Sequence, residues 1–187
     1  MKLSIGAGAR QLDGFLSVDI DPALKPDIVA DITQPLPWPD ASVDCLFCEE
    51  VLSQIAPQAC VGFLRECVRI LRPGGVVRVL TPDLARFAKA YLEQPDWLVA
   101  IWNKHVGIPL FTGTAAEVFN VGMRGVGPFV YDHATVQRLA DQAGMRLHRS
   151  SFNKSLHPAM CGIDMRTAEE TLTMYLELTP AHDPAYA

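Results

Sequence analysis

The chain has 187 residues, of which 49% are hydrophobic and 20% are charged, which is the balance of a folded domain rather than of a disordered segment. The formal net charge of −5 disfavours a surface that follows a phosphate backbone, so nucleic acid is not an expected partner. No apolar run approaches the roughly 20 residues that cross a bilayer, so no membrane association is expected. We predict one domain over residues 1–187 with a full-sized core.

The five cysteines are an odd number and lie among apolar neighbours, which predicts free thiols in a reducing cytoplasm. Cys45 and Cys48 have C-x-x-C spacing, but they fall in a predicted strand. Because side chains alternate along a strand, an offset of three places these two thiols on opposite faces. We therefore predict buried thiols here and no metal site.

Short apolar runs in the first part of the chain predict five strands that are covered on both faces. These runs are Lys2–Ile5, Leu16–Ile20, Ile28–Ala30, Cys45–Cys48 and Val76–Leu80. Residues 57–71 carry apolar side chains at three- and four-residue spacing, which predicts an amphipathic helix. Pro73–Gly75 then ends the helix and leads into the fifth strand.

The second part of the chain begins with residues 83–105, which are predicted to be helical with a break near Pro95. Residues 106–130 contain five glycines and two prolines, and we predict a long irregular loop that covers the site. Residues 132–143 form the next predicted helix, and 146–152 and 171–178 form the last two strands, paired antiparallel. The expected fold is an α/β sheet of about seven strands, mostly parallel, with an antiparallel pair at one edge.

Four short motifs follow one another at the ends of these strands. The glycine-rich turn Ile5–Gly8 ends the first strand, Asp19 ends the second, and Asp31-Ile32 follows the third. The Leu71–Gly75 segment, Leu-Arg-Pro-Gly-Gly, joins the predicted helix to the fifth strand and is the most specific of the four. This series resembles the class I S-adenosylmethionine-dependent methyltransferases of the type 11 kind, whose fold is Rossmann-like.

The resemblance implies S-adenosyl-L-methionine as cofactor and S-adenosyl-L-homocysteine as product. Glycine in the first turn lets the backbone approach the cofactor closely, Asp19 would accept hydrogen bonds from the ribose hydroxyls, and Asp31 would meet the adenine amine. Without a cofactor, these residues would be a plain tight turn, a solvated strand-end carboxylate and a turn-forming Asp. The cofactor-binding residues implied by the family are Gly6, Ala7, Gly8, Asp19, Ile20, Asp31, Ile32 and Cys48.

The family places groups beside the reactive methyl after the fourth strand, where Glu50 follows Cys48. Glu50 is therefore a candidate for acceptor binding or proton removal, and the alternative is an acid that interacts with the dipole at a helix N-terminus. Related proteins often carry histidine at the positions of Glu50 and Gln54, and this chain does not. His133, beside the predicted loop, is the second catalytic candidate, and a packing role is its alternative.

A second departure from the family lies between the first two strands, where Ala9–Gly14 is too short for a helical crossover of a dozen residues. Arg10 or Lys2 would then have to supply the positive charge that a helix N-terminus supplies in the family.

The expected function is methyl transfer to a small-molecule acceptor through an O or N nucleophile. A methyltransferase-like protein that binds without catalysis is the alternative, and a nicotinamide-dependent oxidoreductase is disfavoured because its fingerprint needs glycine at Gln11. The sequence leaves the oligomeric state undecided, and a homodimer that covers the shortened sheet edge is one option.

Overall fold

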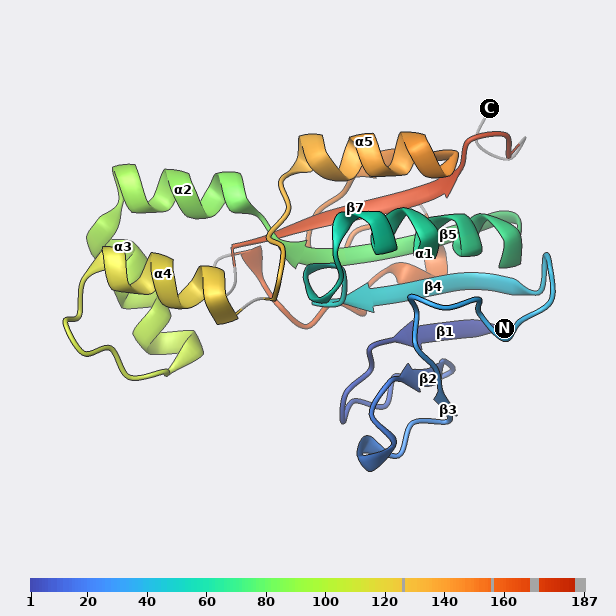
Figure 1. The fold of residues 1–187 in the computed structure, drawn as a ribbon, viewed down its shortest axis with the longest axis horizontal. Helices are drawn as coiled ribbons and strands as arrows, with labels where there is room; N and C mark the ends of the chain where they lie inside the picture. The colour runs from blue at the N-terminus through green and yellow to red at the C-terminus, as the bar shows by residue number, and fades with distance from the viewer. Residues whose placement is uncertain (126, 156, 169–171, 184–187) are drawn as a thin grey trace.

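The computed structural model of the chain describes residues 1–125, 127–155, 157–168 and 172–183. Its centre is a seven-stranded sheet in the order β3-β2-β1-β4-β5-β7-β6 (Figure 1). The strands are β1 (Lys2–Ile5), β2 (Leu16–Asp19), β3 (Ile28–Val29), β4 (Val43–Glu49), β5 (Leu71–Pro82), β6 (Met145–Arg149) and β7 (Thr173–Pro180). Neighbours among β1–β5 pair in parallel, and β7 is antiparallel to both β5 and β6. The predicted sheet, with its antiparallel pair at one edge, is confirmed.

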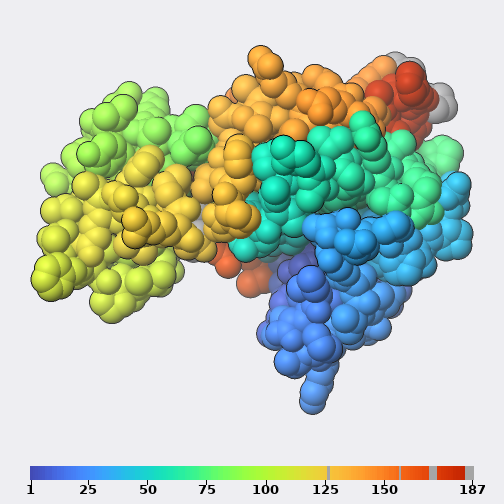
Figure 2. All heavy atoms as spheres, viewed as in Figure 1, coloured from blue at the N-terminus to red at the C-terminus, as the bar shows by residue number. Residues whose placement is uncertain are grey.

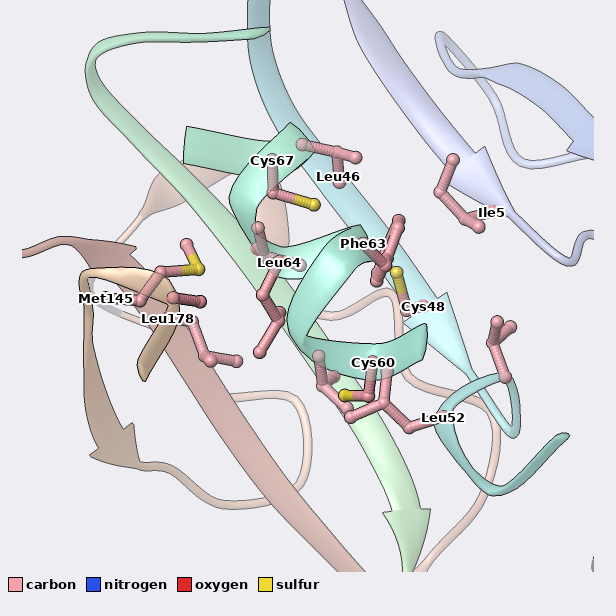
Figure 3. Close-up of a cluster of buried hydrophobic side chains, with 14 of the residues drawn as sticks. Ile5, Leu46, Cys48, Leu52, Cys60, Phe63, Leu64, Cys67, Met145 and Leu178 are labelled. Carbon is pink, nitrogen blue, oxygen red and sulfur yellow. The ribbon is translucent and has the colours of Figure 1, made fainter. Parts of the chain in front are cut away.

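One face of the sheet is covered by α1 (Pro57–Ile70) and α5 (His133–Ala143) (Figure 1). Figure 3 shows the apolar side chains of α1 facing the sheet, with Phe63 beside Cys48 of β4 and Leu64 on the side of Leu178, all in one buried cluster. The other face carries a smaller cluster in which Cys45 is buried with Phe15, Phe47 and Tyr175. Cys45 and Cys48 therefore lie on opposite faces, as their spacing in a strand predicts.

Three more helices form a separate lobe beyond the carboxyl ends of β4 and β5 (Figure 1). They are α2 (Leu84–Glu93), α3 (Pro95–Ile101) and α4 (Ala115–Gly125). Asp83 caps α2 by accepting a hydrogen bond from the Ala85 amide at 3.0 Å, and a π-helical turn, Trp102–Val106, follows α3. Phe87, Leu98 and Trp102 are buried in the lobe's own core.

The prediction of an irregular loop over residues 106–130 is wrong for α4. Thr114 begins this helix: its hydroxyl accepts a hydrogen bond from the Glu117 amide at 3.2 Å. The Glu117 carboxylate in turn accepts from the amides of Phe111, Thr112 and Gly113, which fixes the preceding turn. Gly122, one of the glycines that suggested a loop, lies inside the helix, and a Cβ there would lie 3.0 Å from the Phe87 ring.

The connection from β1 to β2 contains no helix, as its length predicts. Two tight turns take its place, in which the Arg10 amide donates to the Ala7 carbonyl at 3.0 Å and the Phe15 amide donates to the Leu12 carbonyl at 3.0 Å. At the other end of α1, Pro73–Gly75 does not end the helix, because α1 stops at Ile70 and β5 already begins at Leu71. In the described part of the chain, no helix combines the length and the apolar character needed to cross a membrane.

Candidate functional site

Three cavities adjoin one another where β1, β2 and β4 end, and the side chains of Glu50 and Gln54 line all three. In the space-filling view, the surface is hollowed between the α2–α4 lobe and the N-terminal strands (Figure 2). The cavities measure about 440, 370 and 310 Å³, within or near the range of small-molecule sites. We call them the Asp19 cavity, the Arg10 cavity and the apolar cavity.

The Asp19 cavity collects most of the residues that the sequence assigns to the cofactor. It is lined by Gly6, Asp19, Ile20, Asp31 and Ile32. Parallel strands bring their carboxyl ends to one edge of the sheet, and a ligand site at that edge is the rule for open α/β sheets. The convergence follows from the order β3-β2-β1-β4.

The glycine turn after β1 has the backbone that its residues imply. Gly6 and Gly8 have φ of 61° and 58°, a left-handed conformation that favours glycine. A Cβ on Gly6 would lie 2.4 Å from Val51 Cγ2, so the turn is closely packed against Val51. The Gly8 amide donates to Asp19 Oδ2 at 2.8 Å, which ties the turn to the end of β2.

Two carboxylates at the strand ends are held by short local hydrogen bonds. Asp19 Oδ1 accepts from the Asp21 amide at 3.0 Å, in addition to its bond from Gly8. Asp31 Oδ1 accepts from the amide and the hydroxyl of Thr33 at 2.9 and 2.8 Å, and these bonds lower the pKa of Asp31. Each carboxylate oxygen can accept more than one hydrogen bond, so both side chains can also receive donors from a ligand.

Glu50 has three unusual properties. Its φ is 60°, and a non-glycine residue in this region is a strained conformation that clusters at functional sites. Its Oε1 is buried and has no hydrogen-bond partner in the described structure. Burial raises the pKa of its carboxyl to about 7, against the opposing charge of Arg166 and with a further upward effect of Glu49.

The alternative role for Glu50, an acid at a helix N-terminus, does not fit the structure. The first α-helix after β4 begins only at Pro57, and its first turn contains no acidic residue. The Glu50 amide instead donates to the Leu80 carbonyl of β5 at 2.8 Å. The carboxyl group therefore lines the three cavities and does not lie at the N-terminus of an α-helix.

The connection between α4 and α5 holds the turn that follows Glu50. The buried Tyr131 hydroxyl donates to the Ile55 carbonyl at 2.9 Å. A Cβ on Gly127 would lie only 2.1 Å from the Ser53 carbonyl oxygen, so only glycine permits this approach. These contacts fix the short 3₁₀ turn Leu52–Gln54. The turn carries Gln54, whose side chain lines all three cavities together with that of Glu50.

The Arg10 cavity is lined by Gly6, Ala7, Gly8, Arg10, Glu49 and Arg166, among others. Arg10 donates to Glu49 Oε2 at 3.1 Å and to the Ile163 carbonyl at 2.7 Å. The Lys2 ammonium lies instead over the Phe15 ring, 4.7 Å from its centroid. Of the two cations that could replace a helix N-terminus, Arg10 is the one at the glycine turn.

Cys48 and His133 lie apart from the residues just described. The Cys48 thiol is fully buried against α1 (Figure 3), and burial raises its pKa strongly. His133 begins α5, and burial and then Arg149 lower its pKa. Neither lines one of the three cavities, so their roles in cofactor binding and catalysis stay predictions. Among the described residues, no group of three or more His, Cys, Asp or Glu is placed to hold a metal ion.

The buried Arg78, which no sequence motif singled out, holds the segment that carries Arg166, and Arg166 lines the apolar cavity and the Arg10 cavity. This arginine of β5 donates to both oxygens of Asp164, at 2.7 and 2.5 Å, and to Glu177 Oε1 at 3.0 Å. It also donates to the carbonyls of Ser151 and Lys154. The network anchors the segment before β7, which carries Arg166. An arginine inside the otherwise apolar run Val76–Leu80 was the signal that a buried partner exists.

Comparison with known proteins agrees with this geometry. Residues 9–79 match the family described as a methyltransferase domain. A probable S-adenosylmethionine-dependent methyltransferase of Mycolicibacterium smegmatis is 47% identical over 53 residues, which cover 28% of this chain and 20% of that protein. The chain thus matches about a fifth of the length of that curated relative.

Two solved structures share the fold over nearly the whole chain. The pyocyanin biosynthetic protein PhzM has a TM-score of 0.60 at 12% identity, covering 96% of this chain and 50% of that one. A methyltransferase in complex with the Haloferax volcanii Trm112 activator has a TM-score of 0.54 at 16% identity, covering 97% and 82%. The chain shares the Rossmann-like fold of class I methyltransferases, and residues 9–79 match a methyltransferase domain. The family resemblance that the motifs predict is confirmed.

Proposed function

We propose that this chain is an S-adenosylmethionine-dependent methyltransferase that acts on a small-molecule acceptor. The observation that carries the proposal is the continuity of the three cavities, which join the glycine turn and two strand-end carboxylates to an apolar cavity through Glu50. A methyl-transfer site needs both a cofactor cleft and an acceptor space that meet at one point. The smegmatis relative, whose name gives S-adenosylmethionine as its cofactor, supports the choice of methyl donor.

The residues of the Asp19 and Arg10 cavities fit the parts of this cofactor. Asp19 would accept from the ribose hydroxyls, and Asp31, kept ionised by Thr33, would accept from the adenine amine. Ile20 and Ile32 would contact the ring. Arg10 would meet the methionine carboxylate beside Gly6–Gly8, where the left-handed glycines leave room for a close backbone approach.

When bound, the cofactor supplies a methyl group that its sulfonium charge already activates. The chain then has to orient the acceptor, exclude water and take up a proton where the acceptor carries one. Glu50 is the group at the meeting point of the cavities that can do the last of these. A base with a pKa near 7 is well matched to neutral pH.

Binding without transfer is the second candidate function. The helix-free connection from β1 to β2 favours it, because the positive helix end that would meet the methionine carboxylate is missing there. Incubation with S-adenosylmethionine and a panel of small hydroxyl and amine compounds separates the two. Formation of S-adenosylhomocysteine that depends on an acceptor supports the enzyme, and cofactor binding without acceptor-dependent turnover across the panel supports the second candidate.

The acceptor and the partners of the chain are proposed on separate grounds. A small molecule fits the volume of about 310 Å³ of the apolar cavity better than a macromolecule does, and PhzM, named for pyocyanin biosynthesis, lends support. The Haloferax structure contains a methyltransferase together with an activator protein, so a protein partner is a further proposal for this chain. Size-exclusion chromatography with light scattering tests whether the chain forms the homodimer predicted from its short sheet edge.

A further inference from the structure

The apolar cavity has a composition that restricts what it can hold. Its lining includes the apolar side chains of Phe87, Leu98, Trp102, Ile108, Val121 and Leu172. Trp102 uses its only polar atom internally, since Nε1 donates to the Ile108 carbonyl at 2.9 Å. The cavity therefore offers carbon surface over most of its extent, and water inside it would find few partners.

Polar side chains are gathered at one end of this cavity. Among the described lining residues, Glu50, Gln54 and Arg166 supply them. Glu50 and Gln54 also line the Asp19 and Arg10 cavities, and Arg166 also lines the Arg10 cavity. A ligand that fills the apolar cavity would thus present one polar group toward Glu50 and keep the rest of its surface on carbon.

The volume of about 310 Å³ stands near the lower bound of the roughly 300–1,000 Å³ of small-molecule pockets. Gly122 contributes to this space, because a Cβ there would lie 3.0 Å from the Phe87 ring and 3.6 Å from Trp102. One or two fused rings fill such a space, whereas a sugar would leave its hydroxyls without partners on these walls.

We propose that the acceptor is a compact aromatic molecule with one free hydroxyl, held by its ring in the apolar cavity while the Glu50 carboxylate accepts the hydroxyl proton. The inference rests on the proposed function and specifies its acceptor and its base. As the acceptor oxygen forms its bond to the methyl carbon, the O–H bond breaks and its proton passes to Glu50. The electron pair of the methyl–sulfur bond stays on sulfur, so the charges balance without any other reactant.

The charges around Glu50 are compatible with this role. Arg166 favours the ionised carboxylate, Glu49 on the preceding position disfavours it, and Arg10 partly neutralises Glu49 at 3.1 Å. The unpartnered Oε1 gives the acceptor hydroxyl a buried atom to which it can donate. A hydrogen bond to a buried carboxylate is stronger than one between neutral groups.

Binding of 2-naphthol, a two-ring phenol that stays protonated at neutral pH, tests the inference. Its methyl ether, 2-methoxynaphthalene, is the matched ligand without a proton, and equilibrium dialysis measures both through the fluorescence of the ring. We expect 2-naphthol to bind about tenfold more tightly at pH 8 than at pH 5.5, because Glu50 ionises between these values. The ether should show no such gain, and Glu50→Gln should remove it from 2-naphthol.

Filling the cavity provides the second arm of the test. Gly125 lines it with open space where a Cβ would stand, so Gly125→Leu should weaken both ligands at least tenfold. Gly62 on α1 also has open space around its Cβ and lines none of the three cavities, so Gly62→Leu is the matched control and should bind like the wild type.

The outcomes distinguish this inference from the function on which it rests. Binding of S-adenosylhomocysteine, measured on the same protein by calorimetry, reports on the proposed function alone. If that ligand binds but 2-naphthol does not, or binds equally to Gly125→Leu, the acceptor assignment is overturned. If 2-naphthol binds in Gly125→Leu and Glu50→Gln as in the wild type, both the cavity and the base are wrong.

Discussion

Replacing Glu50 with Gln should stabilise the folded chain in a pH-dependent way. The Glu50 carboxyl has a pKa of about 7 in the folded chain because it is buried, against an ordinary value of 4.5. The folded state therefore holds this proton more tightly than the unfolded state does. The stability that the protonated group confers is complete below about pH 4.5 and is lost as the pH rises through 7.

The size of the effect follows from the two pKa values. Each pH unit between them corresponds to about 1.4 kcal/mol, so the ionised side chain costs the folded chain about 3 kcal/mol, or about 2 kcal/mol if water relaxes around it. Glutamine has nearly the same shape and does not ionise. The advantage of Glu50→Gln over the wild type should thus be small at about pH 5 and reach about 2–3 kcal/mol at about pH 8.

Urea denaturation of both proteins across this pH range measures the difference. Glu93, which is exposed on α2 in an ion pair with Lys89, provides the control Glu93→Gln, whose difference from the wild type should stay small and nearly constant. Other groups titrate in the same range, but they cancel in the comparison of variant with wild type. A Glu50→Gln difference that does not grow between pH 5 and 8 would refute the burial of this carboxyl.

Two further predictions concern the glycine turn and the buried arginine. Gly8→Ala should lower the free energy of unfolding by about 1–2 kcal/mol because the φ of Gly8 is left-handed. Gly6→Ala should lower it more, because its Cβ would also meet Val51 at 2.4 Å. Equal losses of stability in thermal denaturation would contradict that contact. Arg78→Met should cost about 3–5 kcal/mol because it removes the buried guanidinium that forms ion pairs with the carboxylates of Asp164 and Glu177. A loss below about 1 kcal/mol in urea denaturation would show that those carboxylates are solvated or protonated.

Elements with a strong local pattern could be predicted from the sequence. The helix over residues 57–71 and the strand Lys2–Ile5 agree with α1 and β1 to within a residue, because apolar spacing and flanking prolines and glycines act locally. Helix α5 was equally clear, since Asp132 caps its start and Gly144 ends it with φ of 78°. The short connection between β1 and β2 could be predicted from chain length alone.

Local composition misled where packing decides the structure. Five glycines and two prolines between residues 106 and 130 concealed α4, although Thr114 and Glu117 form the capping-box pattern that marks a helix start. Gly122 serves close contact with Phe87 rather than flexibility. The distribution of glycines cannot by itself distinguish these uses.

The candidate site was predictable to the extent that strand order determines it. Gly6, Asp19 and Asp31 end consecutive strands, so their convergence needs only the parallel topology. The apolar cavity was not predictable, because α2–α4 build it from side chains whose tertiary positions no short motif specifies. The partners of Arg78 lie 86 and 99 residues away along the chain, a separation that leaves no local pattern.

Calorimetric titration of the purified chain with S-adenosylhomocysteine tests the central claim most directly. We expect the wild type to bind and Asp13→Ala, whose exposed side chain lines none of the cavities, to bind equally well. Asp19→Ala should lose at least tenfold in affinity, or about 1.4 kcal/mol. Circular dichroism of each variant serves as the control for folding. A folded wild type that fails to bind, or an Asp19→Ala variant that binds equally well, would contradict the assignment of the Asp19 cavity to the cofactor.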